Sequence, residues 1–137
     1  EATDMTLVIL IIILALMEYM VFSFRVGMAR GKYGIQAPAI TGNPEFERHF
    51  RVQQNTLEQL IIFIPAILAF SWMAESIGWP GNYIASGLGV IWLIGRFLFA
   101  SSYVRDPGSR AIGFMMTFFP SALMVLGTLV CILISFI

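Results

Sequence analysis

The sequence has little of what catalytic and metal-binding sites are usually built from. Among its 137 residues there are one cysteine and one histidine, so neither a disulfide framework nor a His/Cys metal site can be assembled within the chain. Charged residues make up 12% of the chain, about half the usual share of a soluble domain. Lys/Arg and Asp/Glu number eight each, which leaves no net charge. The basic surface of a nucleic-acid-binding protein and the high net charge of a disordered chain are therefore both absent.

Apolar residues, in contrast, make up 58% of the chain. A chain of this length has too little interior to hide so much apolar surface from water, which excludes a soluble enzyme. The apolar residues form four runs, each near the roughly 20 residues that a membrane-crossing helix needs. The sequence therefore predicts an all-α membrane protein, a four-transmembrane-helix bundle in which residues 1–137 form a single domain. The predicted spans are about 6–25, 45–75, 81–104 and 111–137.

The positive charges predict how the chain crosses the membrane. All of them lie in or beside the first and third connections, or toward that end of the third span: Arg25, Arg30, Lys32, Arg48, Arg51, Arg96, Arg105 and Arg110. The termini and the second connection carry only the acidic residues Glu1, Asp4 and Glu75. By the positive-inside rule, the basic side faces the cytoplasm and both termini face the opposite side. The expected location is a bacterial inner membrane or the endoplasmic reticulum.

Helix breakers mark two of the connections. Gly42-Asn43-Pro44 punctuates the first one, so the second helix is expected to begin near Pro44 and to project beyond the hydrocarbon. Pro107-Gly108 separates the third helix from the fourth.

A polar face on the second predicted helix is the first candidate site. Its members are Arg48, Arg51, Asn55 and Glu58. At roughly 100° per residue, these side chains fall within about 80° of one another. A solvated amphipathic helix is the alternative interpretation, but the face runs directly into the apolar span, where an unpaired Glu58 carboxylate is costly. Such a carboxylate needs a cationic partner, either Arg51 or the ammonium of a ligand. Guanidinium, amide and carboxylate groups together fit a zwitterion with more than one carboxylate.

The third predicted helix carries a second set at the same membrane side. Arg96, Phe99 and Tyr103 share one face, and Arg105 and Arg110 follow. Taken singly, Tyr103 also fits an interfacial anchor and the last two arginines fit topology-setting charges, whereas Arg96 within a span is expected to pair or to line a polar cavity. The sequence shows no catalytic triad, phosphate loop or nucleophilic cysteine, so the ligand is expected to bring the nucleophile. A thiol fits, because a neighbouring arginine lowers the pKa of a thiol and favours the reactive thiolate.

Two stretches carry a family resemblance. NPEFERHFRVQQNTLE (Asn43 to Glu58) resembles the signature of the MAPEG family, the membrane-associated proteins in eicosanoid and glutathione metabolism. ASGLGVIWLIGRFLFASSY (Ala85 to Tyr103) resembles the third helix of that family, especially of microsomal glutathione S-transferase 3-like and bacterial members. The resemblance implies a homotrimer of four-helix bundles, with glutathione bound between neighbouring subunits near the cytosolic side.

The resemblance also implies roles for individual residues. The positions that match the glutathione-binding residues of the family are Arg51, Asn55, Glu58, Tyr103, Gln53 and Arg30. Of these, Glu58 would hold the glutathione amino group, while Gln53 and Arg30 would reach glutathione from the adjacent subunit. Arg110 is the best match to the arginine that activates the thiol, and Arg105 is a second candidate.

Two departures from the family pattern bear on the expected activity. Gln59 and Phe99 stand where several eicosanoid-producing members carry tyrosine, or tyrosine or histidine, which favours a generalist enzyme over a leukotriene or prostaglandin synthase. The expected function is a glutathione transferase acting on hydrophobic electrophiles from the lipid, with glutathione-dependent peroxidase activity as a candidate addition. Two alternatives stay open. One is a non-catalytic lipid- or glutathione-binding scaffold member, and the other is a small proton-coupled exporter that uses Glu18 in the first span.

Overall fold

The computed structural model describes residues 2–137, with side chains from Met5 onward, so Glu1 and the side chain of Asp4 lie outside what is described. The described chain is all-helical, and four of its helices are long and apolar enough to cross a membrane, which confirms the predicted helical class. These helices are α1 (Ala2–Tyr33), α2 (Pro44–Ser76), α3 (Gly81–Arg105) and α4 (Ala111–Ser135). A short 3-10 helix, η1 (Pro107–Ser109), joins α3 to α4.

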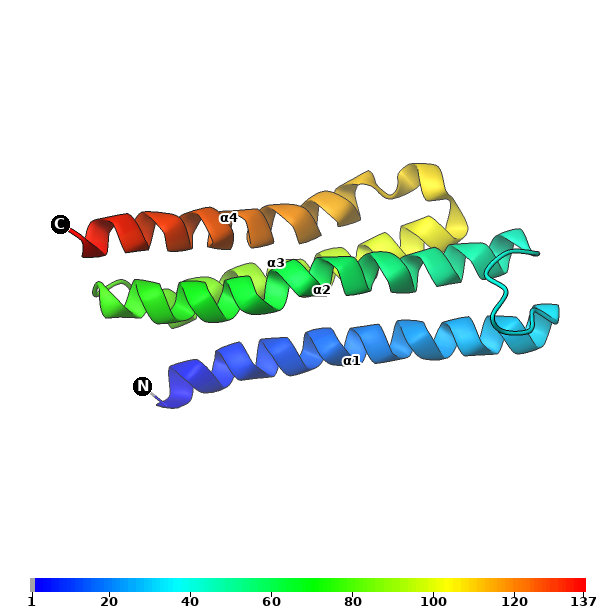
Figure 1. Cartoon of the computed structure of the whole chain (residues 1–137), viewed down its shortest axis with the longest axis horizontal. Coiled ribbons are helices and arrows are strands. Elements are labelled where there is room, and N and C mark those ends of the chain that lie inside the picture. Colours follow the sequence, from blue (N-terminus) through cyan, green and yellow to red (C-terminus); the bar gives the residue numbers. More distant parts are fainter. Residues whose placement is uncertain (1) are drawn as a thin grey trace.

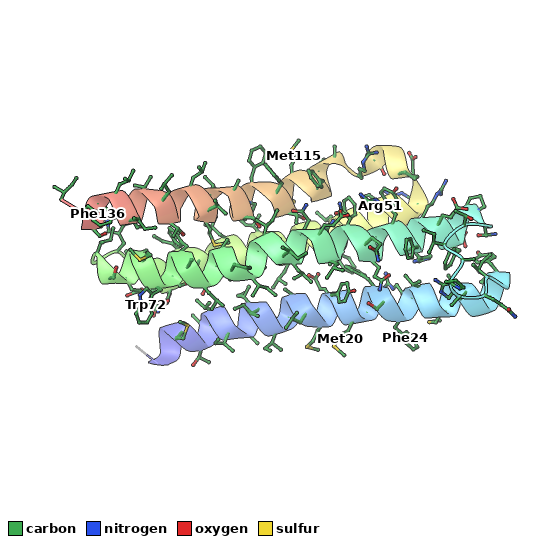
Figure 2. All side chains as sticks on the ribbon, in the orientation of Figure 1. Met20, Phe24, Arg51, Trp72, Met115 and Phe136 are labelled. Atoms are coloured by element: carbon green, nitrogen blue, oxygen red, sulfur yellow. The ribbon has the colours of Figure 1, made fainter. Side chains whose placement is uncertain are left out.

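The four helices lie roughly along one axis and form an elongated bundle (Figure 1). Both ends of the chain lie at one end of the bundle, and the α1–α2 connection and η1 lie at the other. The basic residues of the two connections therefore gather at the end opposite the termini. The outer surface is apolar: Met20, Phe24 and Met115 are exposed and project away from the bundle (Figure 2). Such a surface suits contact with lipid chains rather than with water.

Local signals place the helix ends. The Asn43 side chain accepts hydrogen bonds from the backbone N–H groups of Glu45 (2.9 Å) and Phe46 (3.0 Å), and Pro44 occupies the first turn. This N-cap confirms the predicted start of the second helix. α1, however, continues beyond the predicted span end near residue 25 and ends at Tyr33, before Gly34 with φ +68°. The apolar run stops earlier than the helix because the last turns of α1 are amphipathic, with basic residues that complement the helix dipole.

The interior between the helices is packed with large apolar side chains. Phe63 of α2 and Trp92 of α3 stack with their ring centroids 4.4 Å apart, and both are fully buried. Cys131 of α4 is also fully buried in this core, where it packs as a small apolar side chain.

α3 and α4 approach closely through Gly95 and Gly113. A Cβ atom placed on Gly113 would lie 2.3 Å from the backbone N of Phe99 and 2.9 Å from the carbonyl oxygen of Gly95. A Cβ on Gly95 would lie 2.5 Å from the Cβ of Met116. Small residues allow helix backbones to approach one another in this way. The contact fixes the start of α4, which follows Arg110, against the end of α3, which carries Phe99 and Tyr103.

Candidate functional site

A cavity of about 460 Å³ lies near the end of the bundle that carries the connections, between α2, α3 and the start of α4. Its lining residues are Arg51, Asn55, Phe99, Tyr103, Arg110 and Phe114. All but the last were identified in the sequence analysis, although they come from three separate stretches of the chain. The structure therefore brings four of the ten predicted site residues, Arg51, Asn55, Tyr103 and Arg110, into one cavity.

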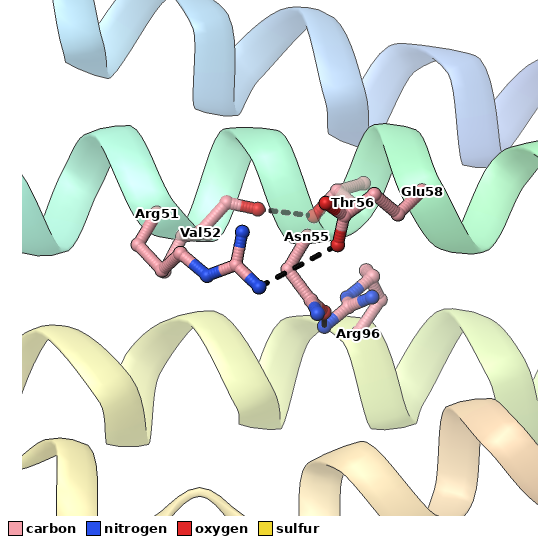
Figure 3. Close-up of polar contacts among 6 residues, drawn as sticks. All are labelled: Arg51, Val52, Asn55, Thr56, Glu58 and Arg96. Atoms are coloured by element: carbon pink, nitrogen blue, oxygen red, sulfur yellow. Dashed lines mark hydrogen bonds and ion pairs between the residues drawn. The ribbon is translucent and has the colours of Figure 1, made fainter. Parts of the chain in front are cut away.

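Arg51 and Glu58 form an ion pair across two turns of α2, with 3.5 Å between Arg51 Nη2 and Glu58 Oε1 (Figure 3). Of the two partners considered for Glu58, a cation of the chain or a ligand ammonium, the structure shows the first. The exposed fractions of the two side chains are 49% and 55%, so water screens the pair and its contribution to stability is small. Both groups are thus accessible and can exchange each other for the carboxylate and ammonium groups of a ligand.

Asn55 lines the cavity from α2 and is held from behind by Arg96 of α3. Arg96 Nη2 donates a hydrogen bond of 2.7 Å to Asn55 Oδ1 (Figure 3). Arg96 is fully buried, and its guanidinium lies over the ring of Phe99, 4.2 Å from the centroid. Arg96 therefore does not line the cavity itself, but it contacts two residues that do, Asn55 and Phe99.

Aromatic rings form one wall of the cavity. Phe99 stacks on Tyr103 with centroids 5.5 Å apart and lies 6.4 Å from Phe114 of α4. The sequence analysis did not identify Phe114. The available signal was its spacing of one helical turn from Arg110, which places both on the same side of the start of α4. Gln59, in contrast, is buried on α2 and does not line this cavity.

The two candidate activating arginines occupy different positions. Arg110 lines the cavity, is exposed, and donates one hydrogen bond of 2.8 Å to the carbonyl oxygen of Pro107. Arg105 is exposed at the end of α3 and does not line the cavity. Its backbone carbonyl accepts a hydrogen bond from Arg48, which also binds the carbonyl of Val104. Arg48 thus caps the C-terminal end of α3 and ties it to α2.

Two further predicted site residues lie away from this cavity. Gln53 Nε2 donates a hydrogen bond of 3.1 Å to Ser23 Oγ of α1. Arg30 donates to the carbonyl oxygen of Ala39 at 2.7 Å, and its guanidinium lies 4.9 Å from the centroid of the Phe46 ring. Within one chain, therefore, Gln53 and Arg30 do not join the other predicted ligands.

The arrangement suits recognition of an anionic ligand more than chemistry by the protein itself. Two exposed guanidinium groups, those of Arg51 and Arg110, line one cavity with an amide and a phenol. Arginine binds carboxylates through paired hydrogen bonds, and a cavity beside apolar helices strengthens such contacts. Among the residues that the structure describes, no group of three or more His, Cys, Asp and Glu side chains could hold a metal ion.

Comparison with known proteins agrees with this arrangement. The model of the MAPEG family matches residues 7–130, which include every residue that lines the cavity. The chain is a member of the MAPEG family. This confirms the resemblance carried by the second and third helices.

Characterised relatives of this MAPEG protein include glutathione enzymes. It is 39% identical to human microsomal glutathione S-transferase 2 over 115 residues, which are 83% of this chain and 74% of that protein. It is 44% identical to an uncharacterized protein of Synechocystis sp. over 124 residues, or 90% and 86% of the two chains. Bovine leukotriene C4 synthase is 34% identical over 89 residues, or 65% of this chain and 55% of that enzyme. The similarity thus extends both to proteins named as glutathione S-transferases and to leukotriene C4 synthase.

Proposed function

We propose that this MAPEG protein is a glutathione transferase that binds glutathione in the cavity between α2, α3 and α4 and conjugates it to hydrophobic electrophiles. The observation that carries the proposal is the convergence of Arg51, Asn55, Tyr103 and Arg110 on one cavity, with Glu58 paired to Arg51 at its edge. The relatives named as glutathione S-transferases support the same reaction class.

The groups at the cavity complement the charges of glutathione. That tripeptide carries two carboxylates, one ammonium group and one thiol. Arg51 is suited to bind a carboxylate, and Glu58 is suited to hold the ammonium once its pair with Arg51 opens. The amide of Asn55 and the phenol of Tyr103 add hydrogen-bonding groups for the peptide backbone.

Arg110 is proposed to activate the thiol. A guanidinium beside a thiol stabilises its ionised form, lowers the pKa of the thiol, and so increases the fraction of the nucleophilic thiolate. The thiol proton passes to water, the thiolate sulfur forms a bond to an electrophilic carbon, and the leaving group departs with the electron pair of the bond that breaks. Arg110 suits this role better than Arg105 because both arginines are exposed but only Arg110 lines the cavity.

Two glutathione molecules could also reduce a lipid hydroperoxide to its alcohol and water while forming glutathione disulfide, which makes peroxidase activity a second proposed reaction of this site. The hydrophobic substrate would enter from the lipid, since apolar side chains cover the outer surface of the bundle.

We further propose that the basic end of the bundle faces the cytoplasm and that both termini face the opposite side.

A homotrimer is proposed because Gln53 and Arg30, which match glutathione-binding positions of the family, lie away from the cavity of their own chain. In a trimer, the two side chains would reach the cavity of a neighbouring subunit. Their present partners, Ser23 and Ala39, are compatible with that role because each hydrogen bond leaves further donor groups free on Gln53 and Arg30.

The decisive experiment compares Arg110→Ala with Arg105→Ala in the purified protein. Ultraviolet absorbance measures the thiolate formed on addition of glutathione, and a chloronitrobenzene substrate measures conjugation. Arg110→Ala is expected to remove the thiolate signal and reduce turnover by about 100-fold, while glutathione binding and the oligomer persist. Arg105→Ala is expected to keep both signals. Unchanged thiolate formation in Arg110→Ala would exclude Arg110 as the activating group, and absence of glutathione binding by the wild-type protein would refute the proposed function.

A further inference from the structure

Arg96 carries a charge in the interior of the bundle, and its polar contacts are incomplete. Arg96 is fully buried, and its Nη2 group donates to Asn55. Its Nε and Nη1 groups are also buried, and neither has a hydrogen-bond partner among the described residues. A guanidinium has five N–H donors, and leaving a buried charge uncompensated is costly. Arg96 therefore needs a counter-ion within the bundle.

Glu18 of α1 is the carboxylate that meets this need. Its Oε1 atom is buried and has no hydrogen-bond partner in the described part of the chain. Glu18 is near enough to Arg96 for their opposite charges to interact, but the two make no ion pair within 4.0 Å; among the described residues, that distance is met only by Arg51 and Glu58. A cavity between α1 and α3 is lined by Glu18 and Arg25 of α1 and by Leu93 and Phe97, which flank Arg96 on α3. Glu18 therefore lies against the part of α3 that carries Arg96.

Arg96 in turn determines what Asn55 presents to the other side. Arginine has donors but no acceptor, so the amide oxygen of Asn55 must face Arg96, as the 2.7 Å hydrogen bond shows. The amide NH2 group of Asn55 is then directed away from Arg96, on a residue that lines the candidate glutathione cavity. Without Arg96 the amide could turn over and present its oxygen instead.

We propose that Glu18 is a positioning residue of the glutathione site: its carboxylate is the counter-ion of Arg96, and through Arg96 it keeps the NH2 group of Asn55 available as a donor to glutathione. This inference rests on the function proposed above. It assigns to a carboxylate in the first membrane helix a part in ligand binding on the far side of α3. One water bridging the two groups would serve, because a water-mediated hydrogen bond is nearly as favourable as a direct one.

The first test measures glutathione affinity by calorimetry. Glu18→Gln removes the charge at nearly constant shape and is expected to raise the dissociation constant about fivefold, the size of a lost hydrogen bond of good geometry. Glu18→Asp, which keeps the charge, is expected to recover part of the loss. In an Asn55→Ala background, Glu18→Gln should have no further effect. Glu75→Gln, the same chemical change at the opposite end of the bundle, is the matched control and should bind as the wild type does.

Equal losses from Glu18→Gln in the two backgrounds would overturn the proposal, since Glu18 would then act by a route that does not include Asn55. Unchanged affinity in Glu18→Gln would overturn it as well. Gln59 is a competing partner for Arg96, because its Oε1 is also buried without a hydrogen-bond partner among the described residues. A loss of affinity in Gln59→Leu that is absent in Glu18→Gln would assign the role to Gln59.

A second test does not depend on glutathione. Thermal unfolding in detergent is measured for Glu18→Gln, Arg96→Gln and the double variant. If the two groups form a pair, the double variant should unfold at no lower temperature than Arg96→Gln alone. Additive losses would refute Glu18 as the counter-ion, whatever the outcome with glutathione. Absence of glutathione binding by the wild-type protein would instead refute the proposed function, so the two failures are distinguishable.

Discussion

The contact between α3 and α4 can be tested by adding a single methyl group. Gly113→Ala places a Cβ atom 2.3 Å from the backbone N and 2.6 Å from the Cα of Phe99, where contacts under 3.0 Å are essentially never seen. Both neighbouring atoms belong to the backbone, so no side chain can move aside, and the helices must separate by roughly 0.7 Å or more. Overpacking of this kind costs about 3 kcal/mol, and the better helix propensity of alanine offsets about 1 kcal/mol. The expected net loss of stability is about 2 kcal/mol.

The assay is thermal unfolding in detergent, followed by the loss of helical circular dichroism. A loss of about 2 kcal/mol corresponds to a midpoint lower by about 6 °C for a chain of this size. Gly87→Ala is the matched control, because a Cβ on that glycine of α3 meets no atom within 4 Å. Its midpoint should equal or exceed that of the wild type. If Gly113→Ala unfolds at the same temperature as Gly87→Ala, the close approach of α3 and α4 is not as the structure describes it.

Further consequences follow for the site and for the second helix. Gly113→Ala should also weaken glutathione binding, because Phe99 and Phe114 line the cavity from the two helices that move apart; calorimetry measures this, and an unchanged dissociation constant would show that the cavity tolerates the shift. Glu58→Gln should raise the dissociation constant for glutathione about tenfold by removing the charge that would hold the ammonium, yet change the unfolding midpoint little, because the pair with Arg51 is half-exposed. The reverse pattern, lost stability with unchanged binding, would assign Glu58 a structural role. Asn43→Ala should lower stability by about 1 kcal/mol through loss of the N-cap of α2, whereas Asn43→Asp, which keeps an acceptor, should not; equal losses in both would contradict the cap.

Local chemistry explains why much of the architecture was predictable from the sequence. Apolar runs with few charges predict membrane helices, and the Asn43-Pro44 pair predicts the start of α2 because a side-chain cap and a fixed φ act within a few residues. The shared face of Arg51, Asn55 and Glu58 follows from helical periodicity alone. The end of α1 did not follow from the apolar run, because its last turns remain helical after that run ends. There, burial of Val26 and Ala29 against Phe46 replaces contact with lipid.

Contacts between helices were the part that the sequence did not predict. Periodicity indicates which residues share a face, but not which face of another helix they meet. Phe114 of α4 meets Phe99 of α3 at the cavity because Gly95 and Gly113 allow the two helices to approach closely. Neither glycine lines the cavity, so the pattern of lining residues does not predict this contact. For the same reason, Arg96 was expected to pair or to line a cavity, but its partner Asn55 became evident only from the packing of α2 on α3.

The burial of Arg96 is best understood as a device for orientation rather than for stability. Removing a guanidinium and a carboxylate from water costs several kcal/mol per ion, and an apolar pair of similar volume often packs at least as stably. Stability alone therefore gives no reason to bury Arg96 beside a partly buried Glu18 in a bundle whose other large buried side chains are mostly apolar. What an apolar pair could not do is accept or donate a hydrogen bond, and it would leave the Asn55 amide free to turn. The few charges of the chain thus have two different roles. Arg51, Glu58 and Arg110 are accessible at the cavity and can contact a ligand directly. Arg96 and Glu18 instead act on the ligand through the side chain of Asn55.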